Sequence, residues 1–169
     1  LLHTMVCMEN GKDLAGNELV GEPPKFAKGA VVSPCSDSLD AQLAKMERKV
    51  KAGAEFFQTQ AVYEPEKFIS FMEKAKQFGK PVQLGIVIPK NAGMCRFMNN
   101  NVAGISIPDE MIEELAVDKE RAKAGITGVE IAARIIRECK PYCQGVHIMA
   151  MGWESKIPVL LEQAGISIK

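Results

Sequence analysis

The apolar residues of this chain follow two alternating periods, one typical of strands and one typical of helices. Residues 26–34, FAKGAVVSP, form a short apolar run that ends at a proline, which predicts a strand. Residues 38–53 repeat apolar positions at helical spacing, with Ser38 or Asp37 available as a cap and Gly53 at the end. One buried stripe of that helix is predicted: Leu39, Leu43, Met46 and Val50.

The same alternation continues to the end of the chain. Three further apolar runs predict strands, at residues 54–60, 80–89 and 144–152. Helices are predicted from the intervening and following segments: 64–79, 91–101, 108–116, 119–140 with a break near Gly125 to Gly128, and 153–165. The chain therefore contains four strand-plus-helix units, preceded by the end of a helix.

Such alternation predicts a parallel sheet with right-handed crossovers. Two architectures fit the pattern: an open doubly wound sheet, or part of an eight-unit barrel. A complete barrel takes about 250 residues, whereas this chain has 169. A dinucleotide-binding open sheet usually carries a G-x-G-x-x-G turn, which this sequence lacks. The pattern alone leaves both open.

Composition narrows the class of protein but does not identify a ligand. The 21 basic residues balance 21 acidic residues, so no net charge favours nucleic acid or an anionic membrane as a partner. No apolar run reaches the roughly 18 residues of a membrane span. The N-terminal segment does not resemble a signal peptide. Five cysteines without a C-x-x-C pair favour a reduced, cytoplasmic setting and predict no metal site.

The most informative local feature is the end of the second strand. Gln58 and Gln60 lie there at the same parity, so both side chains should face the same side of the sheet. Parallel-barrel sites lie at the carboxyl ends of strands, which makes these amides candidate ligand contacts. The plainer interpretation is that they hydrogen-bond the backbone of a loop.

Three long blocks resemble the C-terminal half of methylenetetrahydrofolate reductase. They are residues 49–68 (KVKAGAEFFQTQAVYEPEKF), 85–115 (GIVIPKNAGMCRFMNNNVAGISIPDEMIEEL) and 145–165 (GVHIMAMGWESKIPVLLEQAG). The segment GKDLAGNEL, residues 11–19, resembles the family's connection between its fourth helix and fifth strand. That family folds as a flavin-binding (β/α)8 TIM barrel. The resemblance implies that residues 1–169 form the C-terminal half of such a barrel, covering roughly strands five to eight. Residues 1–25 would be a leading helix end and loop, and residues 26–169 four strand-helix units.

The resemblance also implies a function. The family is an oxidoreductase of one-carbon metabolism and methionine biosynthesis that reduces 5,10-methylenetetrahydrofolate to 5-methyltetrahydrofolate. It uses FAD, with NAD(P)H as electron donor. This chain would supply part of the folate and flavin site, while the family's catalytic acid lies in the first four strands, so no catalytic residue is assigned here. The expected partners are folate, an N-terminal half or complementary subunit, and further copies in an oligomer. The alternative is a non-catalytic pterin- or flavin-binding half-barrel within a larger complex.

Site residues follow from the same resemblance. Gln60 takes the place of the family glutamine that contacts folate and nicotinamide, and one amide can both donate to and accept from a pterin edge. Phe97 takes the place of a substrate-packing aromatic, although Met94 and Met98 could instead place it in a core stripe. Gln58 is a further substrate candidate. Trp153 stands where many relatives have an arginine that meets the folate tail.

The predicted flavin contacts lie after the first strand and on the first complete helix. Ser33 and Asp37 align with a family tyrosine and histidine that lie against the flavin. On the helix, Lys45, Arg48 and Lys49 would hold phosphates and ribose, because cations pair well with a pyrophosphate. The plainer interpretation of these three cations is a solvated helix face.

Overall fold

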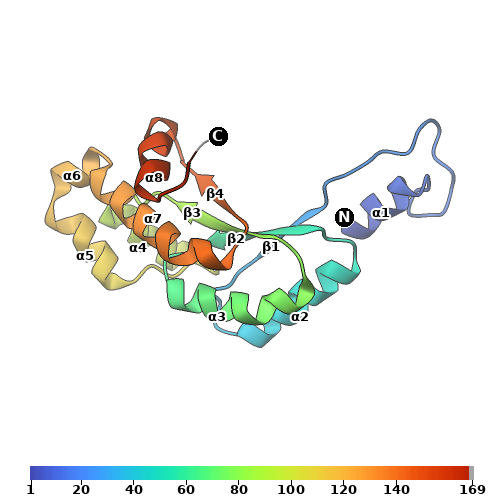
Figure 1. Ribbon diagram of the computed structural model, residues 1–169, viewed down its shortest axis with the longest axis horizontal. Helices are drawn as coiled ribbons and strands as arrows, with labels where there is room; N and C mark the ends of the chain where they lie inside the picture. The colour runs from blue at the N-terminus through green and yellow to red at the C-terminus, as the bar shows by residue number, and fades with distance from the viewer. Residues whose placement is uncertain (168–169) are drawn as a thin grey trace.

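Four parallel strands form the centre of the protein in the computed structural model, which describes residues 1–167 (Figure 1). Their spatial order is the chain order, β1-β2-β3-β4. The strands are β1 (Gly29–Val32), β2 (Phe56–Ala61), β3 (Val82–Val87) and β4 (Gly145–Met149). The predicted α/β class with a parallel sheet is confirmed, although β1 is shorter than the predicted run because only residues 29–32 pair with β2.

Helical segments follow every strand. They are α1 (Leu2–Glu9), α2 (Leu39–Lys51), α3 (Pro65–Ala75), α4 (Ala92–Asn101), α5 (Asp109–Val117), α6 (Lys119–Lys123), α7 (Ile126–Cys139) and α8 (Ile157–Gln163), with 3-10 turns η1 (Lys76–Phe78), η2 (Lys140–Tyr142) and η3 (Glu154–Lys156).

The local sequence sets several of these boundaries. The Ser38 hydroxyl accepts a hydrogen bond from the Ala41 amide, so Ser38 caps α2 as the sequence predicts. Pro65 occupies the first turn of α3, where its missing amide hydrogen is not needed. Gly125 adopts a φ of 80° between α6 and α7, which confirms the predicted break.

The helices bury one face of the sheet. Helices α2 and α7 contact the sheet, and α3 lies between them in contact with both (Figure 1). Phe57, Leu84 and Ile86 point to this side and are fully buried. Parallel sheets are normally covered on both faces. Here the opposite face, which we call the inner face, carries half-exposed polar residues such as Gln58 and Gln83, and Val31 is 48% exposed.

A β-bulge distorts β2 where it approaches β3. The register between these strands shifts between Gln58 and Ala61. In the bulge, the Thr59 hydroxyl donates to the Gln60 carbonyl (2.7 Å) and accepts from the Gly85 amide (2.8 Å). A Cβ atom built on Gly85 would lie 2.2 Å from the Thr59 carbonyl oxygen, so only glycine fits. The bulge therefore sets the direction of the last residues of β2, including Gln60.

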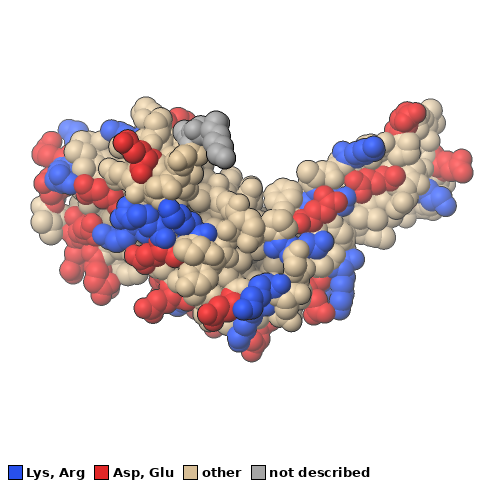
Figure 2. All heavy atoms as spheres, in the orientation of Figure 1, with Lys and Arg blue, Asp and Glu red and all other residues tan. Residues whose placement is uncertain are grey.

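The N-terminal arm, residues 1–25, extends away from the sheet and carries charges of both signs (Figures 1 and 2). One buried cation attaches it. Lys28, 6% exposed, places its Nζ 2.7 Å from a Glu9 oxygen and 2.6 Å from a Glu55 oxygen. Glu9 also accepts from the Phe26 amide, so α1, the segment before β1 and the entry to β2 meet at this cluster.

The Lys28 cluster predicts an acid-sensitive fold. Its hydrogen bonds lower the pKa values of Glu9 and Glu55 below their ordinary 4.5 and raise the pKa of Lys28 above 10.5. The carboxylates therefore stabilise the fold above about pH 4.5, and this contribution is lost as pH falls through their folded pKa values. Thermal unfolding measured across this range should show wild type losing stability more steeply than Lys28→Met. Parallel pH profiles for the two proteins would contradict this assignment.

The bulge predicts that Gly85→Ala destabilises the protein by about 1–3 kcal/mol, because the new methyl group has no room. The matched control is Gly145→Ala, whose Cβ atom would lie at an ordinary 3.5 Å from Gln83. Denaturant unfolding of both variants measures the difference. Equal midpoints would show that β2 and β3 can separate at low cost.

Candidate functional site

The candidate site lies at the carboxyl ends of the strands, on and beside the inner face. Gln60 is half-buried there at the end of β2. A Cβ atom built on Gly104, in the loop after α4, would lie 3.4 Å from the Ser33 hydroxyl oxygen and 4.0 Å from Gln60 Cγ. The fold therefore brings Ser33 and Gln60 together beneath this loop, although they are distant in the sequence.

The two strand-end glutamines have different surroundings. The Gln58 amide nitrogen donates to the side-chain oxygen of Gln83 (2.9 Å), its register partner on β3. The Gln60 side chain makes no hydrogen bond within residues 1–167, and no buried polar side-chain atom in that range lacks a partner. The Gln60 amide thus reaches solvent with its donors and acceptor free. The sequence did not predict Gln83 as a site residue. Its side-chain oxygen already accepts a hydrogen bond from the Gln58 amide nitrogen.

Phe97 lies on the open side of α4. Its neighbours Cys95 and Met98 are buried against the core, whereas Phe97 is 61% exposed. The alternative interpretation, in which Phe97 joins Met94 and Met98 in a core stripe, is therefore wrong. An exposed aromatic ring on a short helix is available to a flat ligand.

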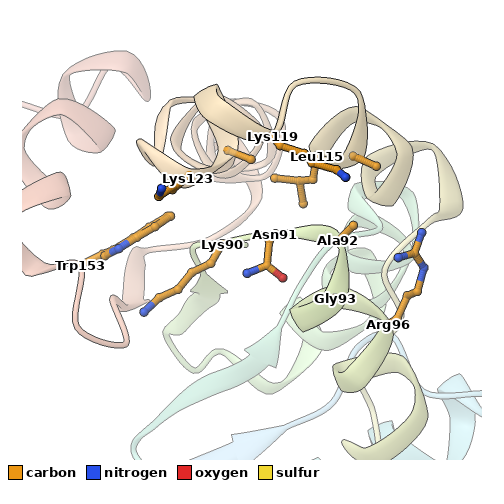
Figure 3. Close-up of a pocket in the computed structure, with 11 residues that line it drawn as sticks. Lys90, Asn91, Ala92, Gly93, Arg96, Leu115, Lys119, Lys123 and Trp153 are labelled. Carbon is orange, nitrogen blue, oxygen red and sulfur yellow. The ribbon is translucent and has the colours of Figure 1, made fainter.

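Trp153 forms one end of a cavity that the sequence did not predict. The ring lies 5.2 Å from the Lys90 ammonium, which in turn donates to the Met151 carbonyl oxygen (2.5 Å). Around it is a pocket of about 510 Å³, which we call the cationic pocket (Figure 3). Its charged and aromatic lining residues are Lys90, Arg96, Lys119, Lys123 and Trp153. They come from three separate parts of the chain, so only the fold assembles them.

The predicted flavin contacts fall into two groups. Lys45 and Arg48 are exposed on α2, whereas the Lys49 ammonium donates to the Val31 carbonyl oxygen of β1 (2.5 Å). Desolvation, together with the charge of Lys45, lowers the Lys49 pKa. Lys49 therefore binds a backbone carbonyl of β1, an edge strand, and does not belong to a solvated helix face. Asp37 lies elsewhere, in a hollow of about 440 Å³ that also includes Cys35 and Gly104.

Other chemistry is limited among the described residues. No cluster of three or more potential metal ligands occurs in residues 1–167. Burial raises the pKa values of Cys35 and Cys95 to about 11, which keeps both as neutral thiols. In the same range, no helix combines the length and apolar character that crossing a bilayer requires.

Comparison with known proteins identifies related sequences. The family model described as methylenetetrahydrofolate reductase matches residues 25–165. Methylenetetrahydrofolate reductases 1 and 2 of Schizosaccharomyces pombe are each 26% identical to this chain, over 77% and 72% of its length. The chain spans about a fifth of those relatives, 22% and 20% of their length.

A solved structure shares the fold. It is an uncharacterized protein from Clostridium thermocellum that binds two copies of 5-methyl-5,6,7,8-tetrahydrofolic acid, and it superimposes with a TM-score of 0.59. The likeness covers 85% of this chain and 54% of that protein, at 19% identity. With a family match over most of its length, the chain belongs to the methylenetetrahydrofolate reductase family.

Proposed function

We propose that this chain is the C-terminal half of a (β/α)8 barrel and supplies part of the folate and flavin site of a methylenetetrahydrofolate reductase. The exposed inner face of the sheet is the main support for this proposal. It ends in a free Gln60 amide and is covered by none of the helices that bury the opposite face.

The sheet has the geometry of a barrel segment. All four strands are parallel and adjacent in chain order, with α2, α3 and α7 along one face. In a closed barrel the inner faces of the strands fill the centre with layers of side chains, and β1 and β4 would each pair with a further strand. Four more strand-helix units would therefore cover the inner face and both edges.

Folate is the substrate class that the free amide favours. A pterin ring presents adjacent donors and acceptors, and the Gln60 amide offers one of each kind. Phe97 could pack against the aryl group of the same ligand, since it is exposed and follows β3 in the chain. The family membership and the methyltetrahydrofolate bound by the Clostridium thermocellum protein support the same ligand class.

The reaction proposed is reduction of 5,10-methylenetetrahydrofolate to 5-methyltetrahydrofolate with electrons from NAD(P)H. FAD, when bound, supplies the hydride chemistry. Within this chain, Lys45 and Arg48 are exposed cations that could hold its phosphates. Ser33 lies beside Gly104, and Asp37 lines the hollow that includes Gly104. Lys49 is the weakest member of this set because its ammonium is already bonded to Val31.

One observation favours the alternative, a non-catalytic half-barrel that binds pterin or flavin within a larger complex. None of the residues in β1 to β4 is an aspartate or glutamate. Glu55 lies next to β2, but at its entry end, where it pairs with Lys28. We infer that the carboxylic proton donor for reduction comes from another part of the complete protein, and that the chain alone should bind rather than catalyse.

Gln60→Ala in the complete polypeptide should weaken folate binding by about 1–3 kcal/mol, the scale of one lost polar contact. Equilibrium titration with a tetrahydrofolate measures the change. Gln77→Ala is the matched control, since Gln77 is exposed on η1 and bonds only the Lys74 carbonyl. Equal dissociation constants for wild type and Gln60→Ala would remove Gln60 from the site.

Residues 1–169 expressed alone should associate, either with each other or with a complementary N-terminal half, because both sheet edges are open. Sedimentation velocity measures the mass. Val31→Lys, on edge strand β1, should reduce self-association, while Val159→Lys on α8 changes an exposed residue away from the sheet edges. A stable wild-type monomer with stoichiometric flavin and reductase turnover would overturn the half-barrel proposal.

A further inference from the structure

A buried hydroxyl group lies between two backbone groups of β2 and β3, directly beside Gln60. We propose that Thr59, through this hydroxyl, is a positioning residue for Gln60 and so determines how tightly the site binds a folate. The inference rests on the proposed function, because Gln60 is the folate contact that Thr59 holds in place.

The register between β2 and β3 identifies a backbone hydrogen bond that the bulge interrupts. Ala61 is the register partner of Gly85, and the Val62 amide donates to the Gly85 carbonyl oxygen (3.0 Å). Both backbone groups of Gly85 therefore face β2, because the N–H and C=O of one strand residue point to the same side. In a regular parallel ladder, the Gly85 amide would then donate to the carbonyl oxygen of Gln60, the residue before Ala61.

The Thr59 side chain takes the place of that bond. The Gly85 amide donates to the Thr59 hydroxyl oxygen (2.8 Å), and the hydroxyl donates to the Gln60 carbonyl oxygen (2.7 Å). One oxygen atom thus relays a hydrogen bond that two backbone groups would otherwise make directly. Thr59 is only 3% exposed, so the relay lies in a low-dielectric environment, where such bonds are stronger than in water.

The relay fixes where the Gln60 side chain leaves the strand. Without the hydroxyl, a buried amide and a buried carbonyl would be unpaired, so the Gly85 amide and the Gln60 carbonyl should close up and bond directly. That closure draws the Gln60 peptide towards β3 and rotates its side chain. A Cβ atom built on Gly104 would lie 4.0 Å from Gln60 Cγ. A rotated Gln60 would leave this place beside Gly104, and its amide would no longer be aimed at the ligand.

The strand should survive loss of the relay because the chain is anchored to β3 again after Gln60. The buried Tyr63 hydroxyl donates to the Val87 carbonyl oxygen (2.8 Å), next to the Val62 amide that already bonds β3. Removal of the Thr59 hydroxyl should therefore change the course of the bulge without unfolding the sheet. Tyr63 also supplies a control, because its hydroxyl joins the same two chain segments beyond the bulge.

The test uses the complete natural polypeptide, equilibrium titration with 5-methyltetrahydrofolate, and denaturant unfolding of each variant. Thr59→Val replaces the hydroxyl with a methyl group of similar size, and Thr59→Ser retains the hydroxyl. Tyr63→Phe is the matched control, since it removes a buried hydroxyl that does not contact Gln60. Thr59→Ala removes the same hydroxyl with a smaller side chain and is used if Thr59→Val does not fold.

Thr59→Val should bind the folate about tenfold more weakly than wild type, within the range expected for Gln60→Ala. Thr59→Ser should bind as wild type does. Tyr63→Phe should lose stability, as Thr59→Val does, but keep wild-type affinity. In the Gln60→Ala background, Thr59→Val should cause no further loss of affinity, because the residue through which it acts is absent.

Four results would overturn the inference and leave the proposed function intact. They are wild-type affinity in Thr59→Val, an equal loss in Thr59→Ser, an equal loss in Tyr63→Phe, and an undiminished effect of Thr59→Val in the Gln60→Ala background. Each would show that the hydroxyl does not act on the ligand through Gln60.

Absence of folate binding to wild type, or wild-type affinity in Gln60→Ala, would instead contradict the proposed function. A crystal structure of Thr59→Val in the complete polypeptide would then decide the role of the hydroxyl without a ligand. A Gln60 carbonyl bonded directly to the Gly85 amide, with the side chain moved away from Gly104, is the expected result. An unchanged position of Gln60 would contradict the positioning role.

Discussion

The structure depends on a parallel sheet that is buried on one face only. Phe57, Leu84 and Ile86 pack beneath α2, α3 and α7, while the inner face holds glutamines. Water can satisfy those amides in this chain, but a parallel sheet in a folded domain is normally covered on both sides. Because the helices cover only one face, the apolar side chains pack on that face and the polar side chains lie on the inner face. It also explains why the proposed function needs further strands.

The same sheet connects stability with the site. The close approach of Gly85 to the Thr59 carbonyl fixes the bulge, and the bulge sets the position from which Gln60 leaves β2. At the opposite end of the strands, Lys28 secures the arm through two carboxylates. The entry ends of the strands thus carry the Lys28 cluster, whereas the carboxyl end of β2 combines a fold-stabilising bulge with the free amide of Gln60. The carboxyl ends of the strands are the usual place for functional groups in parallel-barrel enzymes.

The sequence predicted what depends on local periodicity and missed what depends on contacts between distant residues. The four units, the Ser38 cap and the break at Gly125 follow from spacing and from residue-specific backbone preferences. The shared face of Gln58 and Gln60 follows from strand parity.

The Gln58–Gln83 hydrogen bond was not predicted, because it joins residues 25 positions apart on different strands. The cationic pocket requires three separate parts of the chain to converge. The hydrogen bond from Lys49 to the Val31 carbonyl depends on the placement of β1 beside α2, which helical spacing alone does not predict.

In the proposed function, the inner face becomes a folate site in the complete barrel. A crystal structure of the complete polypeptide with bound 5-methyltetrahydrofolate tests it most directly. We expect the pterin edge to lie within hydrogen-bond distance of the Gln60 amide, on the inner face of a closed eight-stranded barrel. A ligand bound among the helices, or a Gln60 amide bonded only to protein backbone, would contradict it.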